Sequence, residues 1–195
     1  MPKVEVISRT RLLDDFFKVE EAHLRFERFD GTMSEVVPRL NVERGDAAAA
    51  LLVHPGRRAV YLVRQFMYPA LEQAGGWLDT VVAGMIDAGE TPDAAIRREI
   101  LEEVGFAVDK VEPIASFFLS PGGSSERIFL FAATVSDAAR TSAGGGVAAE
   151  NEDIKVLEWP IETFLGRLQS GALKDAKTII AACWLKDNLA RIAPA

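Results

Sequence analysis

Three glutamates carry the clearest chemical signal in this sequence. Glu99, Glu102 and Glu103 are spaced i, i+3 and i+4, so in a helix their carboxylates share one face. Like charges at this spacing repel by roughly 0.2–0.5 kcal/mol per pair, and a dense set of carboxylate oxygens is what hard cations such as Mg²⁺ bind. Arg98 lies one turn before Glu102 and can orient a carboxylate. The alternative is a solvated acidic helix face, which is common on protein surfaces.

The residues around these glutamates predict a loop, a helix and a stop. Gly84 lies in the loop. Thr91 is the expected N-cap and Pro92 the first helical residue. The helix then runs through good helix formers to Glu103, and Gly105 supplies its C-terminal stop.

The whole string from Gly84 to Phe106 resembles the Nudix box. The residues that match at the spacing of that motif are Gly84, Glu90, Arg98, Glu99, Ile100, Glu102, Glu103, Gly105 and Phe106. The resemblance implies a Nudix hydrolase, which uses Mg²⁺ or Mn²⁺ to cleave a nucleoside diphosphate linked to a further group. A match at nine fixed positions is far more specific than a lone glycine-rich loop.

The resemblance also implies roles for individual residues. Glu99, Glu103 and the backbone carbonyl of Ala83 are the expected metal ligands, and Glu102 is a further ligand when more than one ion binds. Arg98 and Glu90 would support the geometry of these carboxylates.

Composition narrows the class of partner. The chain has 195 residues, 49% of them hydrophobic, which favours one sizeable globular core. A net charge of −7 argues against nucleic acid or an anionic membrane as a partner. The single cysteine, Cys183, allows no disulfide within the chain, and no apolar run approaches the ~18–20 residues of a membrane span. We expect a cytoplasmic protein.

Residues 1–45 predict a small antiparallel unit, and residues 46–195 a catalytic domain. Strands are expected over residues 3–9, 16–29 and 33–42, with a hairpin turn at Asp30-Gly31. Pro38 suits an edge strand or a bulge. So small a sheet is marginal alone, so it needs the rest of the chain or a second subunit to pack on.

The remaining elements predict an α+β fold. Strands are expected over residues 47–53, 59–66, 77–83, 111–119, 127–135 and 154–159, and helices over 160–169 and 175–190. The Nudix resemblance implies more: an α/β/α sandwich with a mixed sheet beside the small N-terminal antiparallel sheet.

A catalytic base must come from outside the box, because metal-bound glutamates are poor free bases. Three glycines followed by acids, residues 144–153, describe a mobile loop whose carboxylates can swing over a site. Glu150 is the first candidate for the base and Glu152 the second. The alternative is an ordinary solvated surface loop.

Further segments resemble two branches of the family. Residues 120–126 (S-P-G-G-x-x-E) and 150–154 look like the ADP-ribose pyrophosphatase branch. Residues 143–147 (A-G-G-G-V) and 175–178 (D-A-K-T) look equally like the GDP-mannose pyrophosphatase branch. By this resemblance Glu126 contacts water or metal, and Ser120 and Gly122 are candidate substrate contacts.

Similar proteins are homodimers that exchange N-terminal strands, so that one subunit completes the nucleotide pocket of the other. Phe16, Phe17 and Arg44 are then candidates to contact the nucleobase and phosphates. The alternative for each is a core aromatic or a surface charge.

Two positions depart from the family pattern. Relatives have Arg after Gln-aromatic on the strand before the box, where this chain has Met67, and commonly Glu where it has Thr80. Arg64 is the nearby candidate for phosphate, although it points to the opposite strand face from Gln65. Both departures leave the expected metal ligands intact and bear on substrate identity.

The resemblance therefore implies a metal-dependent pyrophosphatase of a nucleoside diphosphate sugar, with ADP-ribose first and GDP-mannose or another nucleotide sugar as the alternative. A hypothesis of a different class is a sensing module that binds a nucleotide sugar without turnover.

Overall fold

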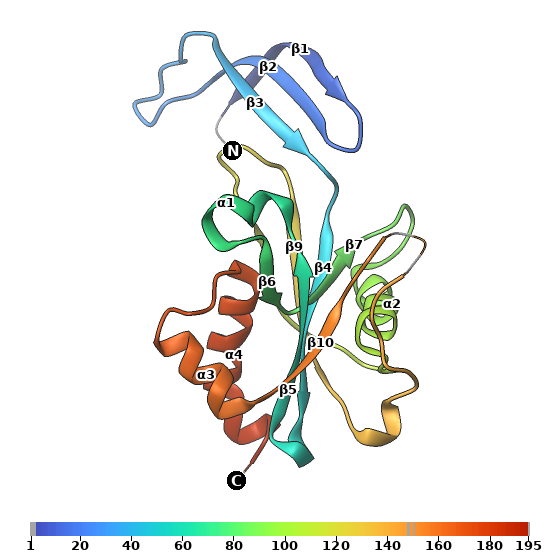
Figure 1. Ribbon diagram of the computed structural model, residues 1–195. Helices are drawn as coiled ribbons and strands as arrows, with labels where there is room; N and C mark the ends of the chain where they lie inside the picture. The colour runs from blue at the N-terminus through green and yellow to red at the C-terminus, as the bar shows by residue number, and fades with distance from the viewer. Residues whose placement is uncertain (1–2, 148, 150, 195) are drawn as a thin grey trace. The chain divides into compact units, whose positions relative to one another are not determined.

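The strand Ala47–His54 (β4) forms the centre of the structure and is buried along its entire length. The computed structural model describes residues 3–147, 149 and 151–194 (Figure 1). Successive β4 side chains enter opposite cores, as the period of two in a strand requires. Leu51 and Val53 pack in one core with Ile161 and Leu185, whereas Leu52 packs in the other.

The sheet around β4 is mixed. Its order is β10-β5-β4-β9-β8, with β6 paired to β5 and β7 paired to β4. β4 runs parallel to β9 and antiparallel to β5 and β7. The bounds are β5 Ala59–Phe66, β6 Trp77–Thr80, β7 Val82–Met85, β8 Glu112–Phe118, β9 Arg127–Thr134 and β10 Lys155–Pro160.

Helices cover both faces of this sheet (Figure 1). Pro92–Val104 (α2) lies on one face, and Ile161–Gln169 (α3) and Ala176–Ile192 (α4) lie on the other. The short elements are η1 Pro55–Arg57, η2 Tyr68–Ala70, α1 Leu71–Ala74 and η3 Asp137–Ala139. The predicted α+β class and α/β/α sandwich are confirmed. No helix among the described residues has the length and apolar character needed to cross a bilayer.

The helix that bears the glutamates forms as predicted. The Thr91 side chain caps it by accepting a hydrogen bond from the amide of Ala94 at 3.4 Å. Gly105 ends it in the left-handed region, with φ +73°. These are local signals, so the sequence sufficed to locate both ends.

The predicted strand over residues 77–83 is instead two strands, β6 and β7. The break falls at Val81, whose amide donates to the side chain of Thr178 at 2.9 Å. The sheet partner changes there from β5 to β4. The prediction of one strand was wrong because the residues that pair with each half, and Thr178 at the break, are distant in sequence.

The chain divides into two compact units, Met1–Asp46 with Phe118–Arg127, and Ala47–Phe117 with Ile128–Ala195. The first contains the antiparallel sheet β1-β2-β3, formed by Val4–Asp14, Lys18–Phe26 and Val37–Glu43. Residues 118–127 join it through bonds such as Val42 N to Gly123 O at 2.8 Å. Pro38 lies in the edge strand β3, as expected.

Candidate active site

The three glutamates do not form a solvated acidic face. Glu99 is 8% exposed and Glu103 is 2% exposed, and both lie on the inward stripe of α2 with Ile96 and Ile100. Only Glu102, with a side chain 33% exposed, lies at the edge of that stripe. Two carboxylates therefore replace apolar side chains on the buried face of a helix, an arrangement that costs stability and points to function.

Arg98 donates hydrogen bonds to three carboxylates, those of Glu90, Glu99 and Glu102. Its Nη1 donates to Glu99 Oε1 at 2.7 Å and to Glu102 Oε2 at 3.1 Å. Its Nε and Nη2 donate to the two oxygens of Glu90 at 3.3 and 3.1 Å. The hydrogen bonds with Glu90, and then those with Glu99, raise the pKa of Arg98 above its ordinary value. The guanidinium is thus a permanently charged fork that holds three carboxylates.

No cation of the described residues pairs with Glu103. Its Oε2 accepts a hydrogen bond from the amide of Ala83 at 3.3 Å. Burial, followed by the charge of Glu99, raises the pKa of the Glu103 carboxyl to about 9. Burial also raises the pKa of Glu99, against the opposing effect of Arg98. Arg98 thus offsets part of the charge of Glu99, whereas Glu103 lies in a place where water is excluded without such a contact.

These residues fit a divalent cation. Buried carboxylates with raised pKa values would be stabilised as anions by an ion, and oxygen ligands are what Mg²⁺ and Mn²⁺ prefer. Within the described parts of the chain, no three His, Cys, Asp or Glu side chains already converge as a ligand set. The carboxylate of Glu99 is bonded to Arg98 and that of Glu103 to Ala83, so the glutamates would reorient to bind one ion together.

Gly84 is required by the packing of this site. It lies in β7, opposite Ala48 of β4. A Cβ atom built on Gly84 would overlap the carboxyl group of Glu99. The first glycine of the motif thus allows a carboxylate of α2 to approach the backbone of the strand that faces it.

The glycine-rich segment after η3 docks on the end of α2. The amides of Gly145 and Gly146 donate to the carbonyls of Glu103 and Glu102 at 2.9 and 3.2 Å. These are carbonyls of the last helical turn, which have no partner within the helix. The three glycines have φ values of +73°, +121° and +84°. Residues 144–146 therefore attach the start of the loop to α2, and the mobility of the acids that follow stays a prediction.

The same segment brings Glu152 to the glutamates. Its Oε2 accepts a hydrogen bond from Val147 N at 2.9 Å, and its charge contributes to the raised pKa values of Glu99 and Glu103. Glu150, the first candidate for the base, lies outside the described residues. Glu152, the second candidate, therefore lies close enough to α2 for its charge to act on both glutamates.

The predicted nucleotide contacts belong to the first unit. Phe16 and Phe17 were expected in a strand, but they lie in the turn between β1 and β2 with ring centroids 5.1 Å apart. The guanidinium of Arg44 lies 5.8 Å from the Phe17 ring and 3.7 Å from the carboxylate of Glu126, which is 7% exposed. The structure thus groups two aromatic rings, one cation and one buried acid.

Ser120 and Gly122 form the turn that precedes Glu126. The carbonyl of Ser120 accepts hydrogen bonds from the amides of Gly123 and Ser124 at 3.1 and 3.0 Å. A Cβ atom on Gly122 would meet nothing within 4 Å, so neither packing nor strain demands glycine there.

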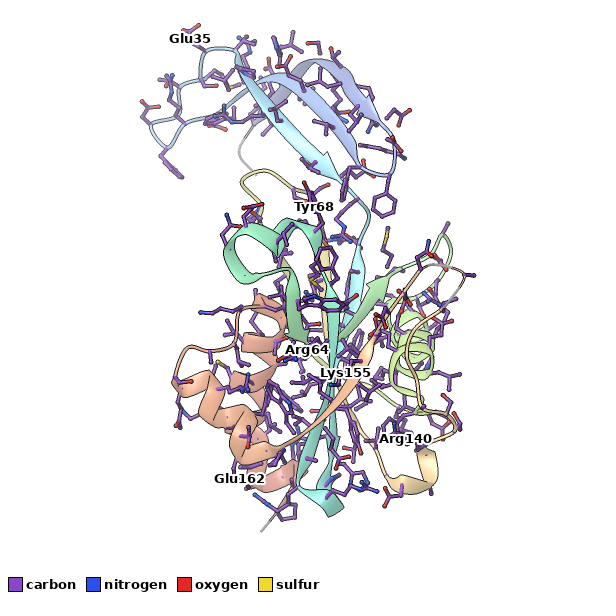
Figure 2. The ribbon with its side chains drawn as sticks, viewed as in Figure 1. Glu35, Arg64, Tyr68, Arg140, Lys155 and Glu162 are labelled. Carbon is purple, nitrogen blue, oxygen red and sulfur yellow. The ribbon has the colours of Figure 1, made fainter. Side chains whose placement is uncertain are left out.

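Arg64 is not brought to the glutamates of α2. It lies on β5 (Figure 2) and pairs with Asp79 of β6, Nη2 to Oδ2 at 2.9 Å. Leu62, two residues earlier, packs in the core with α3 and α4, and Arg167 of α3 also approaches Asp79. The side chain therefore lies on the sheet face opposite α2.

Comparisons with known proteins agree with this geometry. A family profile described as the NUDIX domain matches residues 43–180. ADP-ribose pyrophosphatase of Escherichia coli strain K12 is 39% identical over 184 residues, which cover 94% of this chain and 88% of that protein. GDP-mannose pyrophosphatase of Enterobacter sp. strain 638 is 36% identical over 188 residues, which cover 94% and 95%. The crystal structure of an ADP compounds hydrolase superposes with a TM-score of 0.71, covers 95% of this chain and 96% of its own, and is 20% identical, a likeness of fold alone.

Proposed function

Because the chain belongs to the Nudix family, we propose that it hydrolyses the pyrophosphate bond of a nucleoside diphosphate sugar, with ADP-ribose as the preferred substrate. The observation that carries this proposal is the pair of buried carboxylates, Glu99 and Glu103, held on α2 against the Ala83–Gly84 strand. Water is consumed, one phosphorus–oxygen bond is replaced by another, and AMP and ribose 5-phosphate are released.

The proposed metal ligands are the carboxylates of Glu99, Glu102 and Glu103 and the carbonyl of Ala83. When bound there, Mg²⁺ or Mn²⁺ would supply the positive charge that neutralises phosphate oxygens. Arg98 keeps the carboxylates of Glu99 and Glu102 in place by hydrogen bonds.

The proton of the attacking water is assigned to an acid of the 144–153 loop. Glu152 lies beside the glutamates of α2 and is held by Val147 N, and Glu150 is two residues away in the same loop.

Glu126 is assigned as a contact to water or metal. Phe16 and Phe17 would stack on the nucleobase, Arg44 would bind phosphate, and Ser120 and Gly122 would present the turn to the substrate.

The test of Arg98 is a matched pair of substitutions. Arg98→Lys is expected to weaken Mn²⁺ binding by about 10- to 100-fold, the size of effect of such supporting contacts. The three donors of a lysine ammonium cannot reproduce the four hydrogen bonds that the planar guanidinium makes to three carboxylates. Arg97→Lys is the control, since Arg97 pairs with Asp93. Titration followed by the Mn²⁺ electron paramagnetic resonance signal measures both, and equal affinities in the two variants would show that Arg98 does not organise the site.

The test of the substrate is a parallel assay of ADP-ribose and GDP-mannose with Mg²⁺, with products separated by chromatography. We expect AMP and ribose 5-phosphate to form faster. A faster release of GMP and mannose 1-phosphate would overturn ADP-ribose as the preferred substrate and retain the reaction. Metal binding with no turnover of either substrate would favour the sensing module. Glu150→Gln and Glu152→Gln in the same assay assign the base to whichever variant loses turnover.

We also propose a cytoplasmic homodimer. The β1-β2-β3 sheet and its turn carry many exposed apolar side chains, an unusual surface for an isolated unit. They are Val4, Val6, Ile7, Leu12, Leu13, Phe16, Phe17, Phe26 and Leu40. A second copy of the chain would cover them, and light scattering of the full chain, which gives its mass in solution, would contradict this if it found a monomer. The lone cysteine suits a reducing compartment.

A further inference from the structure

The chain changes sheet partners three residues before Gly84. Thr80 is the last residue of β6 and pairs with Val63 of β5, and Val82 is the first of β7 and pairs with Ala50 of β4. Val81 lies between these ladders and is fully buried. Its amide therefore needs a partner that neither ladder provides, since a buried donor without one is costly.

That partner is the hydroxyl of Thr178, which accepts the hydrogen bond of Val81 N at 2.9 Å. Thr178 lies in the first turn of α4, on the opposite sheet face from α2, and is itself fully buried. The break between β6 and β7 is thus hydrogen-bonded to α4 through a residue that lies 97 positions away in sequence.

Asp175 orients this hydroxyl. It is the N-cap of α4, and its Oδ2 accepts hydrogen bonds from Thr178 N at 2.9 Å and from Thr178 Oγ1 at 2.7 Å. Because the hydroxyl proton points to Asp175, the oxygen lone pairs are left for Val81. Lys177 in turn binds Asp175 Oδ1 at 2.7 Å. These contacts explain the D-A-K-T segment, which resemblance alone had marked.

The change of sheet partner at Val81, called the crossover below, lies next to the proposed metal site. Two residues after Val81, the amide of Ala83 donates to the carboxylate of Glu103. We infer that Thr178 is a positioning residue: its hydroxyl fixes the crossover at Val81 and so places the Ala83 backbone against Glu103. The inference rests on the proposed function, in which Ala83 and Glu103 bind metal.

The test compares Mn²⁺ binding by the full chain, without substrate, in Thr178→Val and Thr178→Ser. Valine keeps the shape of threonine and removes the acceptor, so Mn²⁺ affinity is expected to fall about tenfold, the lower end of the range for supporting contacts. The amide of Val81 should exchange with solvent faster. Serine keeps the hydroxyl and should restore affinity to within about twofold.

Ile161→Val is the control for a mere loss of packing. Ile161 is fully buried in the same core as Val81, at the start of α3. This variant should lose thermal stability without losing Mn²⁺ affinity. If Thr178→Val also loses only stability, Thr178 is an ordinary core residue and the inference is overturned.

If Thr178→Val does not fold, Asp175→Asn replaces it. Asparagine caps helices as well as aspartate does but accepts the hydroxyl proton less strongly. About threefold weaker Mn²⁺ binding supports the inference, and unchanged binding overturns it. If the wild-type protein binds no Mn²⁺, the proposed metal site itself is refuted. If the wild type and Thr178→Val bind Mn²⁺ with the same affinity, only the positioning role is refuted.

Discussion

Glu103→Gln is expected to lower metal-dependent turnover of a nucleotide sugar by about a thousandfold or more. Glutamine keeps the size of the side chain but removes the negative charge that an ion requires, and stabilisation of phosphate charge commonly contributes more than any other effect to the rate of such a reaction. Steady-state kinetics over a range of Mg²⁺ concentrations measures the loss. Retained turnover would show that the ion is bound elsewhere.

The same substitution should make the protein more stable at alkaline pH. The pKa of Glu103 is about 9 in the folded protein against an ordinary value of 4.5. A raised carboxyl pKa contributes stability that is fully present below pH 4.5 and is lost as the pH rises towards 9. With a chelator present, the wild type should therefore lose more free energy of unfolding between pH 5 and pH 9 than Glu103→Gln does.

Denaturant unfolding at several pH values measures this difference, expected to be about 1–3 kcal/mol at pH 8, the cost of an uncompensated buried polar group. Glu35→Gln is the matched control, because Glu35 is exposed in the loop between β2 and β3 (Figure 2). It makes the same chemical change and should alter neither turnover nor the pH dependence. If the free energies of unfolding of the wild type and of Glu103→Gln fall in parallel as the pH rises, Glu103 is not the group that titrates.

Elements defined by neighbours in sequence could be predicted, and elements defined by distant partners could not. The caps Thr91 and Gly105 bracket α2, and an unbroken apolar run marks β4. The break at Val81 depends on Thr178, far along the chain. The run from Phe16 to Phe29 alternates like a strand, yet Phe16 and Phe17 form the turn because β1 continues to Asp14.

The candidate site shows the same division. The spacing of Glu99, Glu102 and Glu103 places them on one helix, which local sequence determines. Their burial could not be predicted, because it depends on packing against β7 and β4 and on the approach that Gly84 permits. Local sequence also gave no reason for Arg64 to lie with α3 rather than α2, since that follows from its pairing with Asp79.

The contact between the glycine segment, residues 144–146, and α2 predicts a second substitution with a large effect on turnover. Gly144 has φ +73°, and a Cβ atom added to it would overlap the carbonyl of Glu103 and Cα of Val104. These are backbone atoms of the last turn of α2, so a side-chain rotation cannot relieve the contact. Gly144→Ala must therefore move either the loop or the helix end that carries a proposed metal ligand.

Gly144→Ala is expected to reduce kcat/KM by about a hundredfold and to lower the melting temperature, because an ångström-scale misplacement of a reacting group has an effect of that size. Displacement of the loop breaks the bond from Gly145 N to Glu103 O and shifts Glu152, whose Cβ packs against Gly146. Metal binding should weaken less than turnover, since the carboxylates of α2 remain.

Gly171→Ala separates the overlap from the cost of the backbone conformation. Gly171 has φ +70°, nearly that of Gly144, but a Cβ atom there meets nothing within 4 Å. Both variants therefore bear the cost of a left-handed alanine, about 1 kcal/mol, and only Gly144→Ala adds the overlap with α2. If thermal unfolding and kcat/KM change equally in the two, the loop is only a connection. If Gly144→Ala loses turnover well beyond Gly171→Ala, the glycines hold the acid loop in register with the helix that carries the proposed metal ligands.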